Sequence, residues 1–279
     1  MSVSGILQLF AGRPRHPIGA DGRMALSDHL RELQARLLKS AVVILLGLVV
    51  SLFFFDEIFD LVLTPYLSAA EALGADVSTV PTIGGAGGPL MLHLKLCGLV
   101  GLVATSPFWL YQIWAFILPG LHSRERRWTR VFAAIAGPLF LSGVVVGYLT
   151  LPKGLEILIG FTPDALTNLV EFGDYLTFLI RTLLVFGIAF EIPVFVILLN
   201  LAGVLSGAAL GAHRPWIVIG TFVFAAVATP STDPFTMLIL AIPMLILFGI
   251  SEVICRLLDR RRRERDEQAG VGDDELSPL

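Results

Sequence analysis

Three glutamates stand in places where the surrounding sequence gives no ordinary reason for a negative charge. Glu125 lies among arginines in a short polar stretch between two long apolar runs (121–128, LHSRERRW). Glu32 precedes the first apolar run, and Glu191 lies deep inside another. Two carboxylates at the ends of membrane segments can converge on a guanidinium, which gains planar bidentate hydrogen bonds that an ammonium group cannot make. The first two glutamates therefore predict a site for a cationic ligand.

Both of these carboxylates also have a purely structural interpretation. Glu125 can pair with a neighbouring arginine and do nothing else. Glu32 lies in an amphipathic stretch (27–37, SDHLRELQARL) in which Arg36 follows four residues later, so the two side chains can pair on one helix face. Leucines at helical spacing share the other face and predict a helix that lies along the membrane surface. The sequence leaves both interpretations open.

Glu191 raises a different question, because it stands near the middle of an apolar run. A charged carboxylate at that depth costs about 3 kcal/mol on the lower of the disputed scales, so we expect it to be protonated and either hydrogen-bonded or facing a wet cavity. Pro193 follows two residues later, frees a carbonyl near Ala189 and predicts a kink. The pair either serves the structure alone or marks a functional site inside the membrane.

The composition indicates that the elements which hold these residues in place are membrane-spanning segments. Of the 279 residues 55% are hydrophobic and 15% charged, with a mean hydropathy of +0.80. A bilayer core of about 30 Å needs roughly 20 apolar residues as helix, and no alternating pattern indicates a barrel. The fold class is therefore all-α: a polytopic membrane protein with six transmembrane helices. The predicted spans are 38–55, 92–117, 131–151, 177–202, 216–229 and 235–255.

The final two spans are predicted to be short. About 14 residues separate Pro215 from Pro230, or roughly 21 Å of helix, and the apolar part of the last span (Phe235 to Ile250) gives roughly 24 Å. Either the bilayer thins there, or a partner covers the helix ends, or the helices extend into the flanking polar residues. Asp233 can cap the last span, with Pro234 at its first helical position.

The distribution of positive charge predicts the orientation. Seventeen of the 20 lysines and arginines fall on one side of the six spans, which places both termini in the cytoplasm. We divide the chain into a cytoplasmic tail (1–26), a six-helix membrane domain (27–256) and a charged, disordered cytoplasmic tail (257–279). The outside segments, 56–91 and 152–176, are acidic.

Several classes of function find little support. The chain has no phosphate-binding loop and no HExxH motif, and Cys97 and Cys255 have no partner spacing, so we expect neither a catalytic site nor a metal or cofactor. A proton-coupled secondary transporter using Glu191 is the main alternative function. The absence of an internal repeat argues against it. An intramembrane hydrolase lacks a catalytic set.

Five stretches, taken in this order, resemble the TatC family, the polytopic receptor subunits of the twin-arginine protein translocase. They are HLRELQARL (29–37), SPFWLYQIWAFILPGLHSRERRW (106–128), FEIPVF (190–195), TPSTDPF (229–235) and LAIPM (240–244). The resemblance implies a core receptor that binds twin-arginine signal peptides of folded proteins at its cytoplasmic face. It also implies TatA/TatB-type single-span partners in an oligomeric complex, and contact with membrane lipid but not with nucleic acid. Export would be driven by the proton-motive force, without enzymatic activity.

The resemblance also assigns residues. It implies that the signal-peptide site consists of Glu32, Glu125, Phe116, Gln112, Arg126 and Arg127. Glu191, Thr229 and Met237 match a partner-helix or intramembrane polar site, and Pro65 and Asp233 match the outside cap and hairpin. Two positions depart from the family pattern: Gln34 stands where an arginine is frequent, and Met237 stands where some members have a glutamine. The partner contact at Met237 is therefore expected to be apolar.

Overall fold

The computed structural model describes residues 26–74, 79–117, 126–163, 167–201, 203–229 and 234–274. Within helices, the side chains of Leu26, Asp28, 126–133 and 265–274 lie outside this description. The chain divides into two compact units, Met1–Ile188 and Ala189–Leu279, and we describe each by itself. Nearly all of the described residues are helical, which confirms the predicted fold class at this level.

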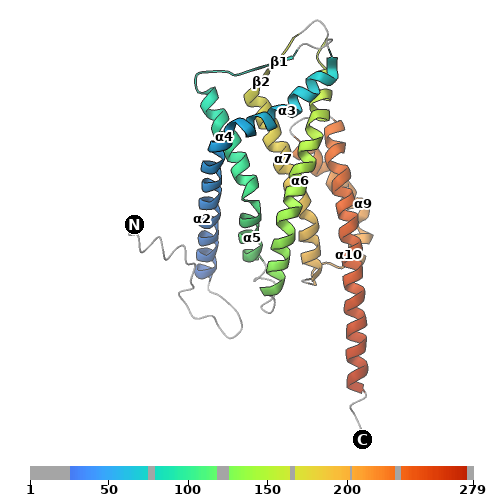
Figure 1. Cartoon of the computed structure of the whole chain (residues 1–279). Coiled ribbons are helices and arrows are strands. Elements are labelled where there is room, and N and C mark those ends of the chain that lie inside the picture. Colours follow the sequence, from blue (N-terminus) through green and yellow to red (C-terminus); the bar gives the residue numbers. More distant parts are fainter. Residues whose placement is uncertain are drawn as a thin grey trace, which may run out of the picture. The chain divides into compact units, whose positions relative to one another are not determined.

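Figure 1 labels the elements of both units. The first unit contains α2 (Leu26–Ser51), a short 3₁₀ turn (Leu52–Phe54), α3 (Phe55–Leu73), β1 (Thr79–Thr82), α4 (Gly88–Ala104), α5 (Ser106–Ile117), α6 (Arg126–Gly160) and β2 (Asn168–Glu171). Helix α7 (Phe172–Leu201) begins in the first unit and ends in the second. The second unit continues with α8 (Gly207–Ala212), α9 (Arg214–Ala228) and α10 (Pro234–Asp274).

All six predicted spans coincide with helix, but not all of these helices are long enough to cross a membrane alone. Among the described residues, four stretches meet the length and hydropathy of a span: 29–73, 134–160, 172–201 and 234–264. The pair α4 and α5 gives a fifth if it counts as one bent span. Helix α9 has 15 residues and is short, as predicted. The structure therefore supports four to five spans on this criterion.

Three sequence predictions are wrong. Helix α10 is 41 residues long, so the last span is not short; it extends into the flanking polar residues, which is one of the alternatives given above. Residues 257–274 are consequently helical, not disordered; the arginines and carboxylates there can pair one turn apart, as Arg260 and Glu264 do at 2.8 Å. The amphipathic stretch 27–37 is not a separate surface helix, since it forms the first turns of α2.

A bend of 59° separates α4 from α5. Pro107 explains its position, because a proline has no backbone N–H and its ring clashes with the carbonyl four residues earlier. Two side chains bond carbonyls just before the break: the Thr105 hydroxyl donates to the Gly101 carbonyl at 2.7 Å, and the Trp109 indole donates to the Leu102 carbonyl at 2.9 Å. The second predicted span (92–117) is therefore a broken helix held by local hydrogen bonds.

Helices α2 and α4 pack closely through glycine. A Cβ added at Gly101 would lie 2.5 Å from the Leu48 nitrogen, and one at Gly47 would lie 3.0 Å from the Gly101 carbonyl oxygen. Small residues allow two helix backbones to approach closely in this way. The resulting van der Waals packing holds the helices together, because there is no hydrophobic driving force between helices in lipid. This contact fixes the position of α2 and of the polar side chains at its start.

A cap covers the end of the first unit that lies opposite the start of α2 (Figure 1). It consists of α3 and a two-stranded parallel sheet, in which Thr79–Thr82 pair with Asn168–Glu171. The sequence analysis predicted neither strand, since four-residue strands carry too little pattern to be detected. Pro65 is fully buried within α3.

Tyrosine hydroxyls attach α3 to the helices below it. Pro65 cannot donate to the Leu61 carbonyl, and the Tyr148 hydroxyl of α6 takes that place at 2.8 Å. The Tyr175 hydroxyl of α7 donates to the next carbonyl, that of Val62, at 2.5 Å. The proline thus frees the Leu61 carbonyl for α6, and the neighbouring Val62 carbonyl bonds α7.

We expect Tyr148→Phe to lower the free energy of unfolding by about 1 kcal/mol, the net contribution of one hydrogen bond. Thermal unfolding of the detergent-purified protein measures the effect. Tyr111→Phe is the matched control, because the structure records no hydrogen bond of that hydroxyl to another described residue. Equal midpoints for the two variants would show that the Tyr148 bond does not stabilise the cap.

Candidate functional site

The predicted receptor residues lie at one end of the first unit. Helix α5 packs against both α2 and α6. The start of α2, the end of α5 and the start of α6 lie at the same end of this unit (Figure 1). The residues named from the sequence on these three helices are therefore brought to one place by antiparallel packing.

An ion pair and an amide form the centre of this patch. The Nη2 and Nε groups of Arg36 donate to Glu32 Oε1 at 2.6 and 3.0 Å, across one turn of α2. The Arg36 Nη1 group donates to Gln112 Oε1 of α5 at 3.2 Å. Gln112 is buried, and the side chains of Glu32 and Arg36 are about one-fifth exposed. Arg36 therefore links the predicted acid to the predicted amide.

An aromatic pair lies beside it. The rings of His29 on α2 and Phe116 on α5 stack with centroids 4.4 Å apart and planes 19° apart. His29 is three residues before Glu32, and Phe116 is four residues after Gln112, so both contacts lie on the same pair of helix faces. Glu32, Gln112 and Phe116 are thus brought together in the structure.

The remaining receptor residues are only partly covered by the description. Glu125 lies outside the described residues. Arg126 and Arg127 open α6, but their side chains lie outside the description. Gln34, the departure from the family pattern, is exposed on α2. The buried residue next to it, Ala35, lies on the face of α2 that packs inward.

This patch can hold a planar cation if a further negative charge is present. Glu32 and Arg36 neutralise one another, and both of their bonds use Oε1 of the carboxylate. The second oxygen, Oε2, can accept from an incoming guanidinium. Glu125, which directly precedes the first residue of α6 in the sequence, is the second carboxylate that the sequence assigns to this site.

The sequence analysis did not include Arg36 and His29 in the receptor site. It noted that Arg36 could pair with Glu32 but treated that pair as the alternative to a functional role. The structure shows that the same arginine reaches Gln112 on another helix. The spacing His29-Glu32-Arg36, three and four residues, puts all three on one helix face and is the signal that could have found them.

The other predicted site residues are distributed over α7, α9 and α10. Both carboxyl oxygens of Glu191 are buried, and Pro193 lies inside a continuous α7. Thr229 is buried at the end of α9, where its hydroxyl donates to the Ala225 carbonyl at 2.8 Å. Met237 is half-buried in the first turn of α10. Asp233 lies outside the described residues.

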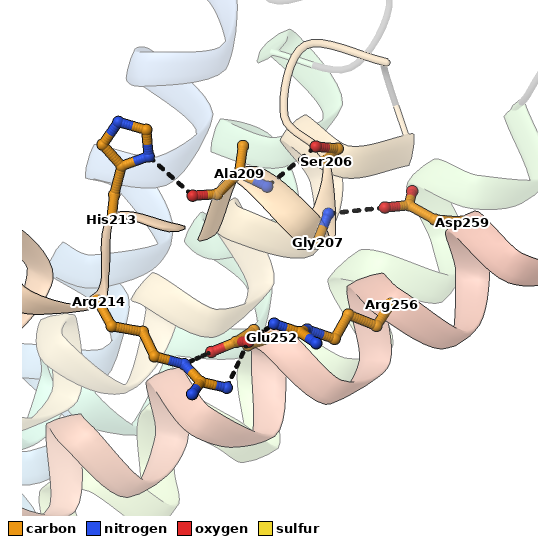
Figure 2. A network of polar contacts seen from close by, with 8 residues as sticks. All are labelled: Ser206, Gly207, Ala209, His213, Arg214, Glu252, Arg256 and Asp259. Carbon is orange, nitrogen blue, oxygen red and sulfur yellow. Dashed lines mark hydrogen bonds and ion pairs between the residues drawn. The ribbon is translucent and has the colours of Figure 1, made fainter. Parts of the chain in front are cut away.

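A second polar cluster, in the second unit, was missed entirely (Figure 2). Glu252 of α10 accepts from Arg214 at 2.7 Å through both oxygens and from Arg256 at 2.7 Å. Two turns beyond Glu252, Asp259 accepts from the backbone N–H of Gly207 at 2.7 Å and from Asn200 at 2.8 Å. A carboxylate at the edge of the predicted last span was the available signal.

Glycines allow α8 to approach α10 in this cluster. A Cβ at Gly207 would lie 2.6 Å from the backbone nitrogen of Arg256. One at Gly211 would lie 2.2 Å from Nη2 of the Arg256 guanidinium. These glycines are four residues apart on one face of α8, the small-xxx-small spacing of close helix contacts. Among the described residues, no group of three histidines, cysteines or carboxylates could hold a metal ion.

Comparisons with known proteins agree with this architecture. The family model described as Sec-independent protein translocase protein (TatC) matches residues 28–243. The TatC protein of Frankia casuarinae is 40% identical over 269 residues, covering 93% of this chain and 74% of that protein. The TatC protein of Aquifex aeolicus is 32% identical over 244 residues, covering 86% of this chain and 98% of that protein.

Solved structures give the same result. A crystal structure of the twin arginine translocase receptor TatC in DDM matches with a TM-score of 0.68 at 32% identity. The match covers 81% of this chain and 99% of that one. With the family model spanning most of the membrane helices, the chain belongs to the TatC family of Sec-independent protein translocase proteins.

Proposed function

We propose that this chain is the signal-peptide receptor of a twin-arginine translocase. The observation that carries the proposal is the meeting of Glu32, Arg36, Gln112 and Phe116 where α2 and α5 pack together. Helix α6, whose first residue follows Glu125, begins at the same end of the unit. A polar patch of this kind between membrane helices suits a ligand that is both cationic and attached to an apolar segment.

The chemistry of the patch favours arginine over lysine. A guanidinium can bond Glu32 Oε2 and Glu125 with its planar donors, while an ammonium group offers a point charge only. The stacked rings of His29 and Phe116 offer a flat surface next to the carboxylate, on which a guanidinium can lie. Arg126 and Arg127 add positive charge around Glu125 and limit the patch to one cationic guest.

The wider role follows the family. The chain would lie in the bacterial inner membrane with both termini in the cytoplasm, and would bind folded cargo through its signal peptide. TatA/TatB-type single-span proteins would join it in an oligomeric complex, with Glu191, Thr229 and Met237 at the partner or intramembrane polar site and Pro65 and Asp233 shaping the outer side. The proton-motive force would drive export, without an enzymatic step. The comparisons do not favour the alternative of a transporter using Glu191.

Site-specific crosslinking tests the receptor role. A photoreactive residue at the exposed position of Gln34 is combined with a twin-arginine peptide and, separately, with a twin-lysine peptide. We expect Glu32→Gln and Glu125→Gln each to lower the twin-arginine crosslink about tenfold, as expected for losing a charged hydrogen bond of 1.5–3 kcal/mol. The twin-lysine peptide should crosslink as weakly as the twin-arginine peptide does with these variants.

Glu57→Gln is the matched control, because it removes the same charge from the exposed start of α3, at the other end of α2. It should leave crosslinking unchanged. Equal crosslinks in all variants, or equal crosslinks for both peptides, would reject the receptor site. Wild-type elution of each variant in size-exclusion chromatography separates loss of binding from loss of fold.

A further inference from the structure

A groove on the second unit combines an apolar floor with the guanidinium of Arg214, and Arg256 binds the same carboxylate, Glu252. The volume of the groove is about 570 Å³, and Arg214, Ile246, Gly249, Ile250, Glu252 and Val253 are among the residues that line it. Ile246, Ile250 and Val253 are each at least half exposed, at helical spacing on one face of α10. A Cβ at Gly249 would meet no atom within 4 Å, so this position opens the floor.

The charged end of the groove is positive. Glu252 is only 6% exposed and accepts from two guanidiniums, so the three side chains together carry one net positive charge. The two bonds from Arg214 use two of its five N–H donors, and the side chain is 63% exposed. Arg256 is 52% exposed. Figure 2 shows both arginines converging on Glu252 from different elements. Free donors therefore remain at the rim of the groove.

The depth of this site suits a lipid headgroup. The apolar part of α10 runs from Phe235 to Ile250, and Arg256 and the four arginines 260–263 follow it. This change marks the boundary between the hydrocarbon core and water. Arg214 opens α9 at the same level, because it bonds Glu252, one turn before Arg256. The exposed isoleucines lie on the core side of this boundary.

We propose that this groove binds an anionic phospholipid, with the phosphodiester at Arg214 and Arg256 and one acyl chain along Ile246, Ile250 and Val253. A headgroup with one negative charge neutralises the single net positive charge of the cluster, whereas a zwitterionic headgroup does not. The acyl chain covers the apolar floor of the groove, which water would solvate poorly. Because the groove shares no residue with the receptor patch, the inference stands independently of signal-peptide binding.

Native mass spectrometry of the detergent-purified full chain tests this, with phosphatidylglycerol and phosphatidylcholine of identical chains as probes. We expect phosphatidylglycerol to be retained about fivefold more, and Arg256→Gln to reduce this excess about fivefold, as one arginine near a membrane surface contributes. Arg263→Gln, which removes an exposed arginine seven residues further along α10, is the matched control and should retain the lipid.

A second pair of variants tests the apolar floor. Gly249→Leu fills the groove without touching a charge and should reduce retention of phosphatidylglycerol at least fivefold. Gly220→Leu on α9, where a Cβ also meets no atom within 4 Å, should not. Equal retention of the two lipids would overturn the proposal. Full retention of phosphatidylglycerol by Gly249→Leu would overturn it as well. Competition by soluble glycerol phosphate would assign a free anion in place of a lipid.

Discussion

Gly101→Ala should destabilise the protein by about 3 kcal/mol, the upper end of the typical range for overpacking. The added methyl group would lie 2.5 Å from the Leu48 nitrogen and 2.9 Å from its Cα, and these are backbone atoms of α2 that cannot rotate away. Helices α2 and α4 must therefore separate. Because α2 also carries Glu32 and Arg36, the twin-arginine crosslink should fall with the thermal midpoint.

Gly98→Ala isolates the clash from the other effects of removing a glycine. Its Cβ would meet the Leu48 Cδ1 atom at 3.7 Å, an ordinary contact, and alanine favours helix by about 0.5–1 kcal/mol relative to glycine. The same substitution one turn earlier should consequently be neutral or slightly stabilising. Midpoints that agree within error for the two variants would show that α2 and α4 adapt without cost and that glycine is not required at the contact.

Sequence reasoning located the helices because their hydrophobic runs are long and uniform. It also named Glu32, Gln112 and Phe116 from separate stretches, and packing of α2 against α5 brings these three together. The Glu32–Arg36 pair followed from spacing alone and is confirmed at 2.6 Å. Periodicity within one helix is a local property, and for that reason it can be read without knowing the fold.

Contacts between helices could not be predicted in the same way. The link from Arg36 to Gln112 joins residues 76 positions apart, and that from Arg214 to Glu252 joins residues 38 apart. Neither pair shares a spacing that a sequence displays. The parallel strands β1 and β2 are four residues each, and α10 passes through charged residues that resemble a disordered tail. For the contacts between helices and for the paired strands, the partner, and not the segment itself, decides the structure.

Removing both arginines around Glu252 should have the largest effect in the second unit. In Arg214→Met/Arg256→Met the carboxylate, 6% exposed, would have neither of the cations that now neutralise it. An uncompensated buried charge is strongly destabilising, and we expect the thermal midpoint to fall by about 10 °C. Arg261→Met/Arg263→Met removes two exposed arginines from the same helix and should leave the midpoint unchanged.

The rescue by a third substitution distinguishes charge from packing. In the Arg214→Met/Arg256→Met background, Glu252→Leu removes the unpaired carboxylate and should return the midpoint to within about 3 °C of wild type, because apolar replacement of a whole buried ion network is often neutral. If the triple variant were as unstable as the double, the arginines would act by their contacts with α8 and not by their charge. Restored stability would also separate this role from the lipid site, because a triple variant that folds without the arginines should no longer prefer phosphatidylglycerol.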